Sequence, residues 1–140
     1  MKTEKVQYLL DTHIWIWLVS GSENIPRKKA ENIEQAIAEN RVFLSQISIW
    51  EMAQKAAQGK IKINQPLNIW LKENTAGLNI LDIPIEVSVD ANTLPGEFHK
   101  DPADRIIVAT ARQKGMTLVT HDGLILTYGK QGHLIVMTLL

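Results

Sequence analysis

The sequence predicts an α/β protein, a three-layer α/β/α sandwich around a mostly parallel central sheet of about five strands. Three observations predict this class. Short apolar segments alternate along the chain with longer helix-like segments, as in chains built from repeated strand–helix units. The strand-like segments are continuous apolar runs, which is typical of strands that helices cover on both faces. A chain of 140 residues is also long enough to bury a core of its own.

Five short apolar runs are predicted to be strands, because each is bounded by polar or turn-forming residues. The first run leads directly into Asp11, and the fourth leads through Thr120 toward Asp122. In chain order the predicted strands are residues 6–10, 42–44, 78–83, 117–120 and 134–137.

The intervening segments are predicted to be helices that mostly begin at a proline or at a Ser or Asp able to cap an N-terminus. Glycines such as Gly21, Gly59 and Gly115 end several of them. In chain order they are residues 12–19, 27–40, 45 or 48 to about 58, 66–76, 84–93, 102–114 and 124–128. No repeat or linker is visible, so we expect one domain over residues 1–140, with its core at about 6–138.

The first predicted helix is apolar on all sides and carries two tryptophans, Trp15 and Trp17. On a helical wheel these lie about 200° apart, so one faces the core and the other faces away from it. An outward indole on a helix without a polar face is explained by a partner surface. We therefore predict that Trp15 or Trp17 contacts a partner.

The composition excludes several classes of protein. The chain has no cysteine, which excludes a disulfide scaffold, a thiolate zinc site and a cysteine nucleophile, and fits a reducing compartment. A hydrophobic content of 45% excludes disorder. The longest uninterrupted apolar run, residues 14–19, is far too short to span a membrane, and the N-terminus does not resemble a signal peptide. We expect no association with a membrane.

The formal charge is balanced, because fifteen Lys and Arg residues face fifteen Asp and Glu residues. A protein that grips nucleic acid by bulk positive charge is normally basic. The balance therefore argues against that mode of binding.

Acidic side chains follow the strands of the predicted sheet. Asp11 ends the first strand, Asp122 follows the fourth, and Glu51 lies on the helix after the second. Asp101 and Asp104 begin the helix that precedes the fourth strand. Because sites in open parallel sheets form outside the carboxyl ends of the strands, we expect these acids to lie close together.

Each acid also has a purely structural explanation. Asp11 and Asp122 can cap the helices that follow them, and Asp101 can cap the helix that Pro102 opens. The segment 48–51 matches a capping box, in which Glu51 would bond back to the amide of Ser48. Taken singly, the capping explanation is the stronger one.

Taken together, the acids need a counter-charge. Two unit charges 4 Å apart repel by about 4 kcal/mol at an effective dielectric constant of 20, and the nearby cations are few: Lys55, Lys100 and Arg105. A divalent cation resolves this conflict, and a ligand set of oxygens suits Mg²⁺ or Mn²⁺. Such a cluster typically polarises a phosphodiester and activates water for attack on it.

Other catalytic patterns are absent from the sequence or have little support. The four histidines lack metal-ligand spacing; His99 and His121 are candidates for a phosphate contact or are simply exposed loop residues. There is no glycine-rich phosphate loop and no nucleophile elbow. A dehalogenase-type phosphatase needs an aspartate where this chain has His13, and the acidic pair of a receiver domain is not evident.

Four segments in this order resemble PIN-domain proteins and, more narrowly, the VapC toxins of bacterial type II toxin–antitoxin systems. The resemblance covers about residues 6–138. The segments that carry it are Tyr8-Leu9-Leu10-Asp11-Thr12-His13, residues 42–55 with Ser48-Ile49-Trp50-Glu51, His99-Lys100-Asp101-Pro102-Ala103-Asp104-Arg105, and Leu118-Val119-Thr120-His121-Asp122.

The resemblance implies a metal-dependent endoribonuclease that leaves 5′-phosphate and 3′-hydroxyl ends. Asp11, Glu51 and Asp104 match the core acidic triad of the family, and Asp122 matches a fourth acid that varies within it. These four would be the catalytic residues and would hold Mg²⁺ or Mn²⁺, as one ion or two.

The resemblance also suggests auxiliary residues. Thr12 and Thr120 stand where the family places small hydroxyls that orient the acids, and Asp101 is either an outer-sphere acid or only a helix cap. Ala103 replaces the aromatic residue usual in this branch, so we expect a packing difference there. The full set of auxiliary candidates is Asp101, Thr12, Thr120, Arg105 and His99.

The implied partners are an RNA substrate, a second copy of the chain and an antitoxin whose C-terminal segment covers the acidic groove, all in the cytoplasm. Transfer, ribosomal and messenger RNA all remain candidate substrates. The alternative is a non-catalytic PIN-like module that binds RNA or protein. The presence of all four acids argues against it, because a degenerate copy would have lost some of them.

Overall fold

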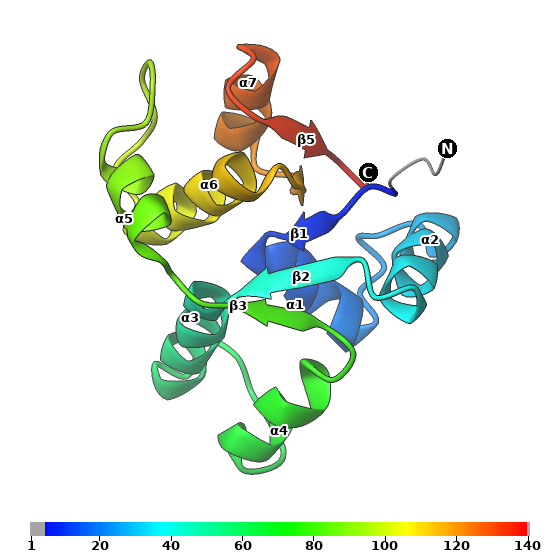
Figure 1. Cartoon of the computed structure of the whole chain (residues 1–140). Coiled ribbons are helices and arrows are strands. Elements are labelled where there is room, and N and C mark those ends of the chain that lie inside the picture. Colours follow the sequence, from blue (N-terminus) through cyan, green and yellow to red (C-terminus); the bar gives the residue numbers. More distant parts are fainter. Residues whose placement is uncertain (1–4, 140) are drawn as a thin grey trace.

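The computed structural model describes residues 5–139, in which strands and helices alternate along the chain (Figure 1). The strands are β1 (Tyr8–Leu10), β2 (Val42–Ser45), β3 (Asn79–Leu81), β4 (Thr117–Val119) and β5 (Ile135–Met137). The helices are α1 (Thr12–Ser20), α2 (Arg27–Ala38), α3 (Gln46–Ala57), α4 (Leu67–Asn74), α5 (Ile85–Asn92), α6 (Pro102–Lys114) and α7 (Gly123–Lys130).

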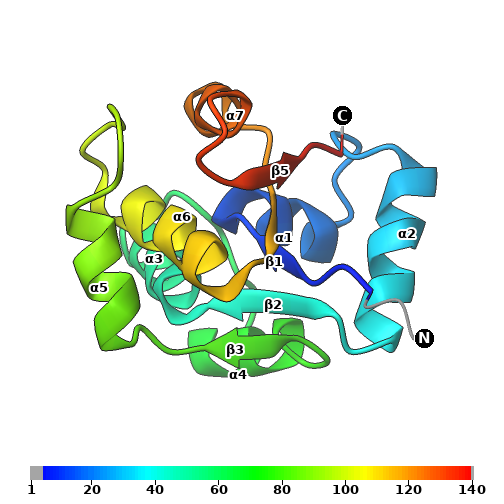
Figure 2. The same ribbon diagram turned by 45° about the horizontal axis from the view of Figure 1, so that its top comes forward.

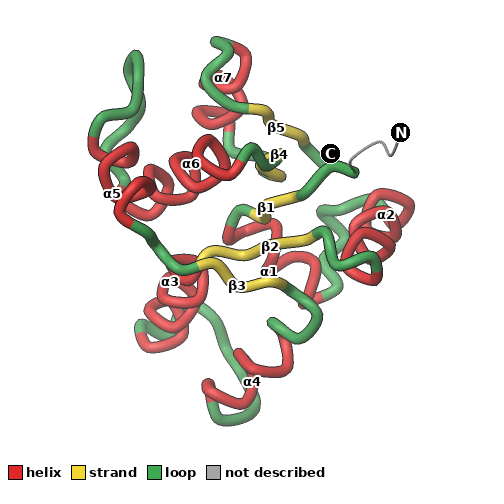
Figure 3. The backbone as a smooth tube through the Cα atoms, in the orientation of Figure 1, coloured by secondary structure: helices red, strands yellow, loops and turns green. Residues whose placement is uncertain are grey.

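The five strands form one sheet in the order β3-β2-β1-β4-β5, and every neighbouring pair is parallel (Figure 3). The chain first moves outward from β1 through β2 to β3, and later from β4 to β5 in the opposite direction. The strand order therefore reverses between β1 and β4. In open α/β sheets a crevice forms outside the carboxyl ends of the strands at such a switch point.

Alternate residues of the central strands face two separate cores, because successive side chains of a strand point to opposite faces. Leu9 and Leu118 pack in one core with residues of α5, α6 and α7. Leu10 and Val119 pack in the other with residues of α1, α2, α3 and α4, and the elements can be followed in Figure 2. The predicted three-layer sandwich with a parallel five-stranded sheet is confirmed.

The element boundaries differ from the prediction by a few residues, each for a local reason. The first strand begins at Tyr8 rather than residue 6, because its pairing with β2 and β4 begins at Tyr8; the Val6 carbonyl accepts from the Arg41 guanidinium at 2.7 Å. The second helix ends at Ala38, because Asn40 adopts a left-handed φ of 61° that turns the chain into β2. The last helix continues to Lys130.

The two tryptophans of α1 have different environments. Trp15 is fully buried, its ring lies 6.0 Å from that of Trp70, and its Nε1 donates to the carbonyl of Asn74 at 2.9 Å. Trp17 is partly exposed. The helical wheel therefore separated them correctly, but the assignment of Trp15 to a partner surface is wrong, since its indole fills the core beneath α4.

In the part of the chain that the structure describes, none of the helices combines the length and apolar character that a membrane crossing requires.

Truncating the buried indole tests this assignment. Trp15→Ala is expected to lower the free energy of unfolding by about 3–5 kcal/mol, because it leaves a cavity and removes the hydrogen bond to the Asn74 carbonyl. Trp50→Ala is the matched control, since Trp50 is 56% exposed and its loss should cost within about 0.5 kcal/mol. Urea unfolding measures both, and equal costs would contradict the burial of Trp15.

Candidate active site

Four acids that the sequence singled out come from four elements around the switch point. Asp11 directly follows β1, and Asp122 lies three residues after the end of β4. Glu51 stands in the second turn of α3, the helix that continues from β2, and Asp104 stands in the first turn of α6. Two of the four elements thus end at the place where the strand order reverses.

The hydroxyl of Thr120 ties the ends of β1 and β4 together. Thr120 Oγ1 donates to Asp11 Oδ2 at 2.7 Å and accepts from the backbone N–H of Asp122 at 3.0 Å. Asp11 is 4% exposed, and its other oxygen accepts from the backbone N–H of Thr12 at 2.8 Å. Both oxygens of this buried carboxylate are therefore hydrogen-bonded, which fixes its orientation.

A second hydroxyl holds the carboxylate of Glu51. Thr12 Oγ1 lies 2.5 Å from Glu51 Oε1 and 2.8 Å from Ser48 Oγ. A hydroxyl has one proton, so the charged carboxylate takes the donation from Thr12, and Ser48 donates to Thr12 in turn. The relay from Ser48 through Thr12 to Glu51 joins α3 to the first turn of α1.

The capping-box explanation of Ser48 and Glu51 is wrong. The N-cap of α3 is Ser45, whose side chain accepts from the backbone N–H of Ile47 at 3.1 Å. Ser48 therefore stands inside the helix, and Glu51 turns toward Thr12 instead of the Ser48 amide. Sequence reasoning missed this role of Ser48, although its spacing of three residues from Glu51 places both on one helix face.

The capping explanation holds for the other acids. Asp122 Oδ1 accepts from the backbone N–H groups of Leu124 at 2.9 Å and Ile125 at 3.1 Å, and Asp101 Oδ1 accepts from that of Asp104 at 3.1 Å. Each of these caps uses Oδ1 only. Capping and ligand binding are thus compatible, because these caps do not use Oδ2 of either carboxylate.

Asp104 shows that the acids act on one another. Its pKa is raised from 3.8 to about 7, first by burial and then by the negative charges of four other acids, which are Asp11, Asp101, Asp122 and Glu51. A carboxyl group under this influence is partly protonated at neutral pH. The set of five carboxylates, called the acid cluster below, therefore carries more negative charge than its surroundings neutralise.

Glu51 responds in the same direction. Burial is the main cause that raises its pKa, and the charges of Asp101 and Asp11 add to it. The hydrogen bond from Thr12 and the positive charge of Lys55 oppose this shift without cancelling it.

The cations predicted near the acids differ in their availability. Arg105 donates from Nε to the carbonyl of Ala91 at 2.7 Å, and from one terminal nitrogen to the carbonyls of Phe98 and His99, both at 3.1 Å. Its guanidinium thus fastens the segment before α6 to the end of α5. Lys100 is exposed.

His99 lies against the acid cluster. Its Nε2 is 3.2 Å from Oδ2 of Asp104, so the imidazolium form would make an ion pair with that carboxylate. The Arg105 contacts hold the backbone of the segment that carries this imidazole.

The donor set fits a hard divalent cation, since every acid offers carboxylate oxygens and the cluster lacks sufficient counter-charge. Among residues 5–139, no three His, Asp or Glu side chains already stand in a finished metal-ligand arrangement. Instead, the oxygens nearest the site are engaged with the hydroxyls of Thr12 and Thr120 and with His99. The residues that fit as ligands are Asp11, Glu51, Asp104 and Asp122.

Comparison with known proteins agrees with this architecture. Residues 8–129 match the family model of the PIN domain. The chain is 33% identical over 114 residues to Ribonuclease VapC22 of Mycobacterium tuberculosis. The aligned region covers 81% of this chain and 85% of that relative.

Solved structures of low sequence identity share the fold. VapBC-1 from nontypeable Haemophilus influenzae has a TM-score of 0.72 at 21% identity and covers 96% of this chain and 98% of that chain. DNA-bound VapBC from Salmonella typhimurium has a TM-score of 0.72 at 17% identity, over 97% and 100% of the two chains. A toxin-antitoxin complex from Klebsiella pneumoniae has a TM-score of 0.65 at 23% identity, over 96% and 98%.

Removing the charge of Asp104 should stabilise the fold in a pH-dependent way. Between pH 3.8 and about 7 the folded protein holds a proton on Asp104 that the unfolded chain releases, so stability falls as pH rises through this window. In EDTA, Asp104→Asn is therefore expected to raise Tm at pH 8, with a gain that shrinks as the pH falls toward 4. Thermal unfolding of the exposed-site control Asp82→Asn should show no such trend; a lower Tm for Asp104→Asn at pH 8 would contradict the shift.

The Thr120 bridge predicts a second stability difference. Thr120→Val is expected to cost about 1.5–3 kcal/mol, because Asp11 loses a charge-assisted hydrogen bond and the Asp122 amide loses its acceptor. Thr110→Val is the control, since Thr110 is equally buried but only donates to the Ile106 carbonyl within its own helix. Denaturant unfolding of both variants and of Thr120→Ser, which keeps the hydroxyl, measures the difference. If Thr120→Val lowers the free energy of unfolding no more than Thr110→Val does, the Thr120 hydroxyl does not stabilise the fold as predicted.

Proposed function

The chain belongs to the PIN-domain family, and on that premise we propose that it is a metal-dependent endoribonuclease that cleaves phosphodiester bonds of RNA. One observation carries the proposal: acids from separate elements meet at the switch point, where burial and then the charges of the other acids raise the pKa of Asp104 to about 7. The 33% identity to a ribonuclease supports the choice of RNA as substrate.

Asp11, Glu51, Asp104 and Asp122 are proposed to hold Mg²⁺ or Mn²⁺. When bound, such an ion polarises the scissile phosphate and makes water a nucleophile at neutral pH. The fit rests on the chemistry of the ligands, since hard cations prefer carboxylate oxygens.

The neighbouring residues have positioning roles in this proposal. Thr120 orients Asp11 and Thr12 orients Glu51, each through a hydrogen bond to a carboxylate oxygen. Asp104 holds a proton near neutral pH until a cation is bound, because burial and the other acids raise its pKa. His99, whose Nε2 lies 3.2 Å from Oδ2 of Asp104, would help to orient that carboxylate.

The biological role proposed is that of a VapC-like toxin paired with a VapB-like antitoxin in the cytoplasm, with the chain acting as a homodimer. The family, the identity to VapC22 and the shared fold with toxin–antitoxin complexes support this role. A non-catalytic binding module is the alternative, and the four acids at the switch point favour the enzyme.

Cleavage assays test the proposal. Purified protein is expected to cut RNA in Mg²⁺ or Mn²⁺ and to stop in EDTA, and Asp11→Asn and Asp104→Asn should each reduce cleavage to background. Asp82→Asn, which removes an exposed acid that is not among those raising the pKa of Asp104, is the matched control and should keep full activity. RNA ends read by sequencing give the target and the end chemistry.

The expected folding behaviour separates loss of catalysis from loss of structure. Asp104→Asn should be inactive while it melts at or above the wild-type temperature. Activity that survives both Asp11→Asn and Asp104→Asn would end the nuclease assignment and leave the binding module.

A further inference from the structure

Three aromatic rings form a cluster that the proposed chemistry does not use. Trp17 stacks on His121, with ring centroids 4.2 Å apart and planes inclined by 29°. His13 meets the same imidazole edge-on, at 6.1 Å and 87°. His13 and Trp17 lie one turn apart on α1, and His121 lies in the turn between β4 and α7. We call these three residues the ring cluster.

The ring cluster adjoins the acid cluster directly. His13 is two residues after Asp11, and His121 immediately precedes Asp122. The Thr120 hydroxyl that joins Asp11 to Asp122 therefore also fixes the two chain segments from which these rings project. The same hydrogen bonds therefore hold both the acids and the segments that carry the rings.

The core does not account for this cluster. His13 is exposed and both Trp17 and His121 are partly exposed, whereas Trp15 of the same helix is fully buried. Nδ1 of His121 is buried and makes no hydrogen bond to the described residues. The imidazole is thus positioned by ring contacts, although a buried ring nitrogen normally has a polar partner.

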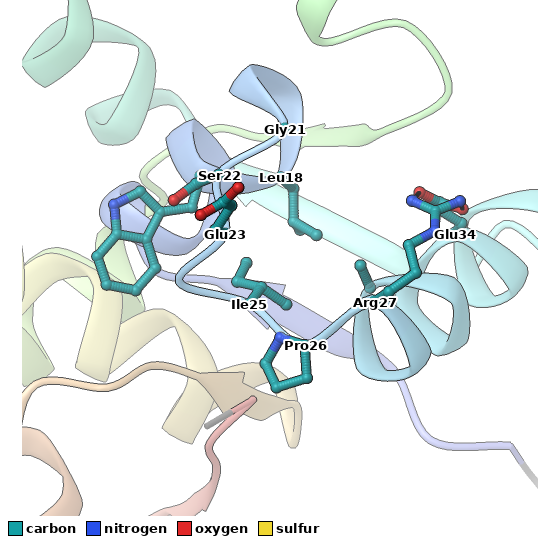
Figure 4. A pocket seen from close by; sticks show the side chains of 10 residues that line it. Leu18, Gly21, Ser22, Glu23, Ile25, Pro26, Arg27 and Glu34 are labelled. Atoms are coloured by element: carbon teal, nitrogen blue, oxygen red, sulfur yellow. Dashed lines mark hydrogen bonds and ion pairs between the residues drawn. The ribbon is translucent and has the colours of Figure 1, made fainter.

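Open space lies beside the indole. Trp17 forms one wall of a cavity of about 350 Å³, together with the end of α1, the following loop and the start of α2. Figure 4 shows Leu18, Ile25 and Pro26 around this space, with Arg27 and Glu34 at its edge. The indole is therefore not enclosed by the protein.

Single-stranded RNA is held largely by stacking of its bases on aromatic side chains, and this stacking tolerates any base because every base has a π-face. A chain without net positive charge has little bulk attraction for phosphates, so a local stacking surface gains importance. Two of the three rings are imidazoles; RNA bases stack on histidine as well as on tryptophan, whereas the anchors of protein interfaces are enriched in Trp, Tyr and Arg.

We propose that His13, Trp17 and His121 form a stacking site for a base of single-stranded RNA that flanks the phosphate to be cleaved. This inference rests on the proposed ribonuclease activity and adds the strand form of the substrate and the surface that places it. The three residues are positioning residues, because they touch the substrate away from the reacting atoms.

Steady-state kinetics on a single-stranded RNA oligomer test the stacking site. His13→Ala and Trp17→Leu are expected to raise KM roughly 5- to 150-fold while kcat changes little, and Trp17→Phe should restore most of the affinity. His133→Ala is the matched control, since its partly exposed ring stacks on Tyr128 instead, at 4.4 Å. His13 is exposed, so His13→Ala keeps the test valid if Trp17→Leu fails to fold.

A binding cycle isolates the base from the phosphates. Anisotropy in the cleavage-deficient Asp104→Asn background compares oligouridine with an oligomer of equal length that lacks all bases. Removal of the bases should weaken binding to the protein that retains Trp17 and should have little further effect on binding to Trp17→Leu. The effects of base removal and of the substitution on affinity are then not additive, as expected for groups in contact. Quenching of tryptophan fluorescence by oligouridine, absent in Trp17→Phe, is the expected spectroscopic signature.

Additive effects of base removal and ring removal, or an unchanged KM in both variants, would overturn the stacking site. Variants that cut RNA normally but bind a VapB-like antitoxin more weakly would also overturn it and give the surface to a protein partner. Failure of the wild type to cleave any RNA would instead count against the proposed function, while the binding cycle would still decide the stacking site.

Discussion

The hydrogen bonds of the Thr120 hydroxyl hold together the centre of this molecule. This hydroxyl donates to the buried carboxylate of Asp11 at the end of β1, and it accepts from the backbone N–H of Asp122 just after β4. Because the strand order reverses between these two strands, this is the place where the sheet opens toward solvent. The orientation of Asp11, the start of α7 and the position of His121 all depend on this contact, so stability and site geometry have the same origin.

The acid cluster explains how a chain with no net charge is suited to a polyanionic substrate. Five carboxylates at one edge would repel an incoming phosphate unless a divalent cation reversed the local sign, and burial together with the charges of the other acids raises the pKa of Asp104. The positive charge predicted near the acids is less available than expected, because Arg105 is committed to backbone carbonyls. In the function proposed here, metal binding and base stacking would together supply attraction that surface charge does not.

Capping and site formation turn out to use the same residues. Asp11, Asp101 and Asp122 each begin a helix by accepting backbone N–H groups, and each faces the acid cluster as well. Helix N-termini favour negative charge, which offsets part of the cost of placing acids side by side. The capping explanation therefore holds for these three acids and is compatible with their proposed functional role, whereas at Ser48 and Glu51 the capping prediction is wrong.

Periodicity, caps and breakers are properties of neighbouring residues, so they predict the order of the elements and a parallel sheet, and that sheet in turn predicts the convergence of the acids. The tertiary structure decided which strands lie side by side, and so why Asp11 and Asp122 share one hydroxyl. Tertiary packing also makes Thr12, rather than the Ser48 amide, the hydrogen-bond partner of Glu51. It buries Trp15 rather than Trp17 in the core, and it engages the Arg105 guanidinium with backbone carbonyls. Each of these outcomes depends on residues distant in the chain, whose packing no local pattern encodes.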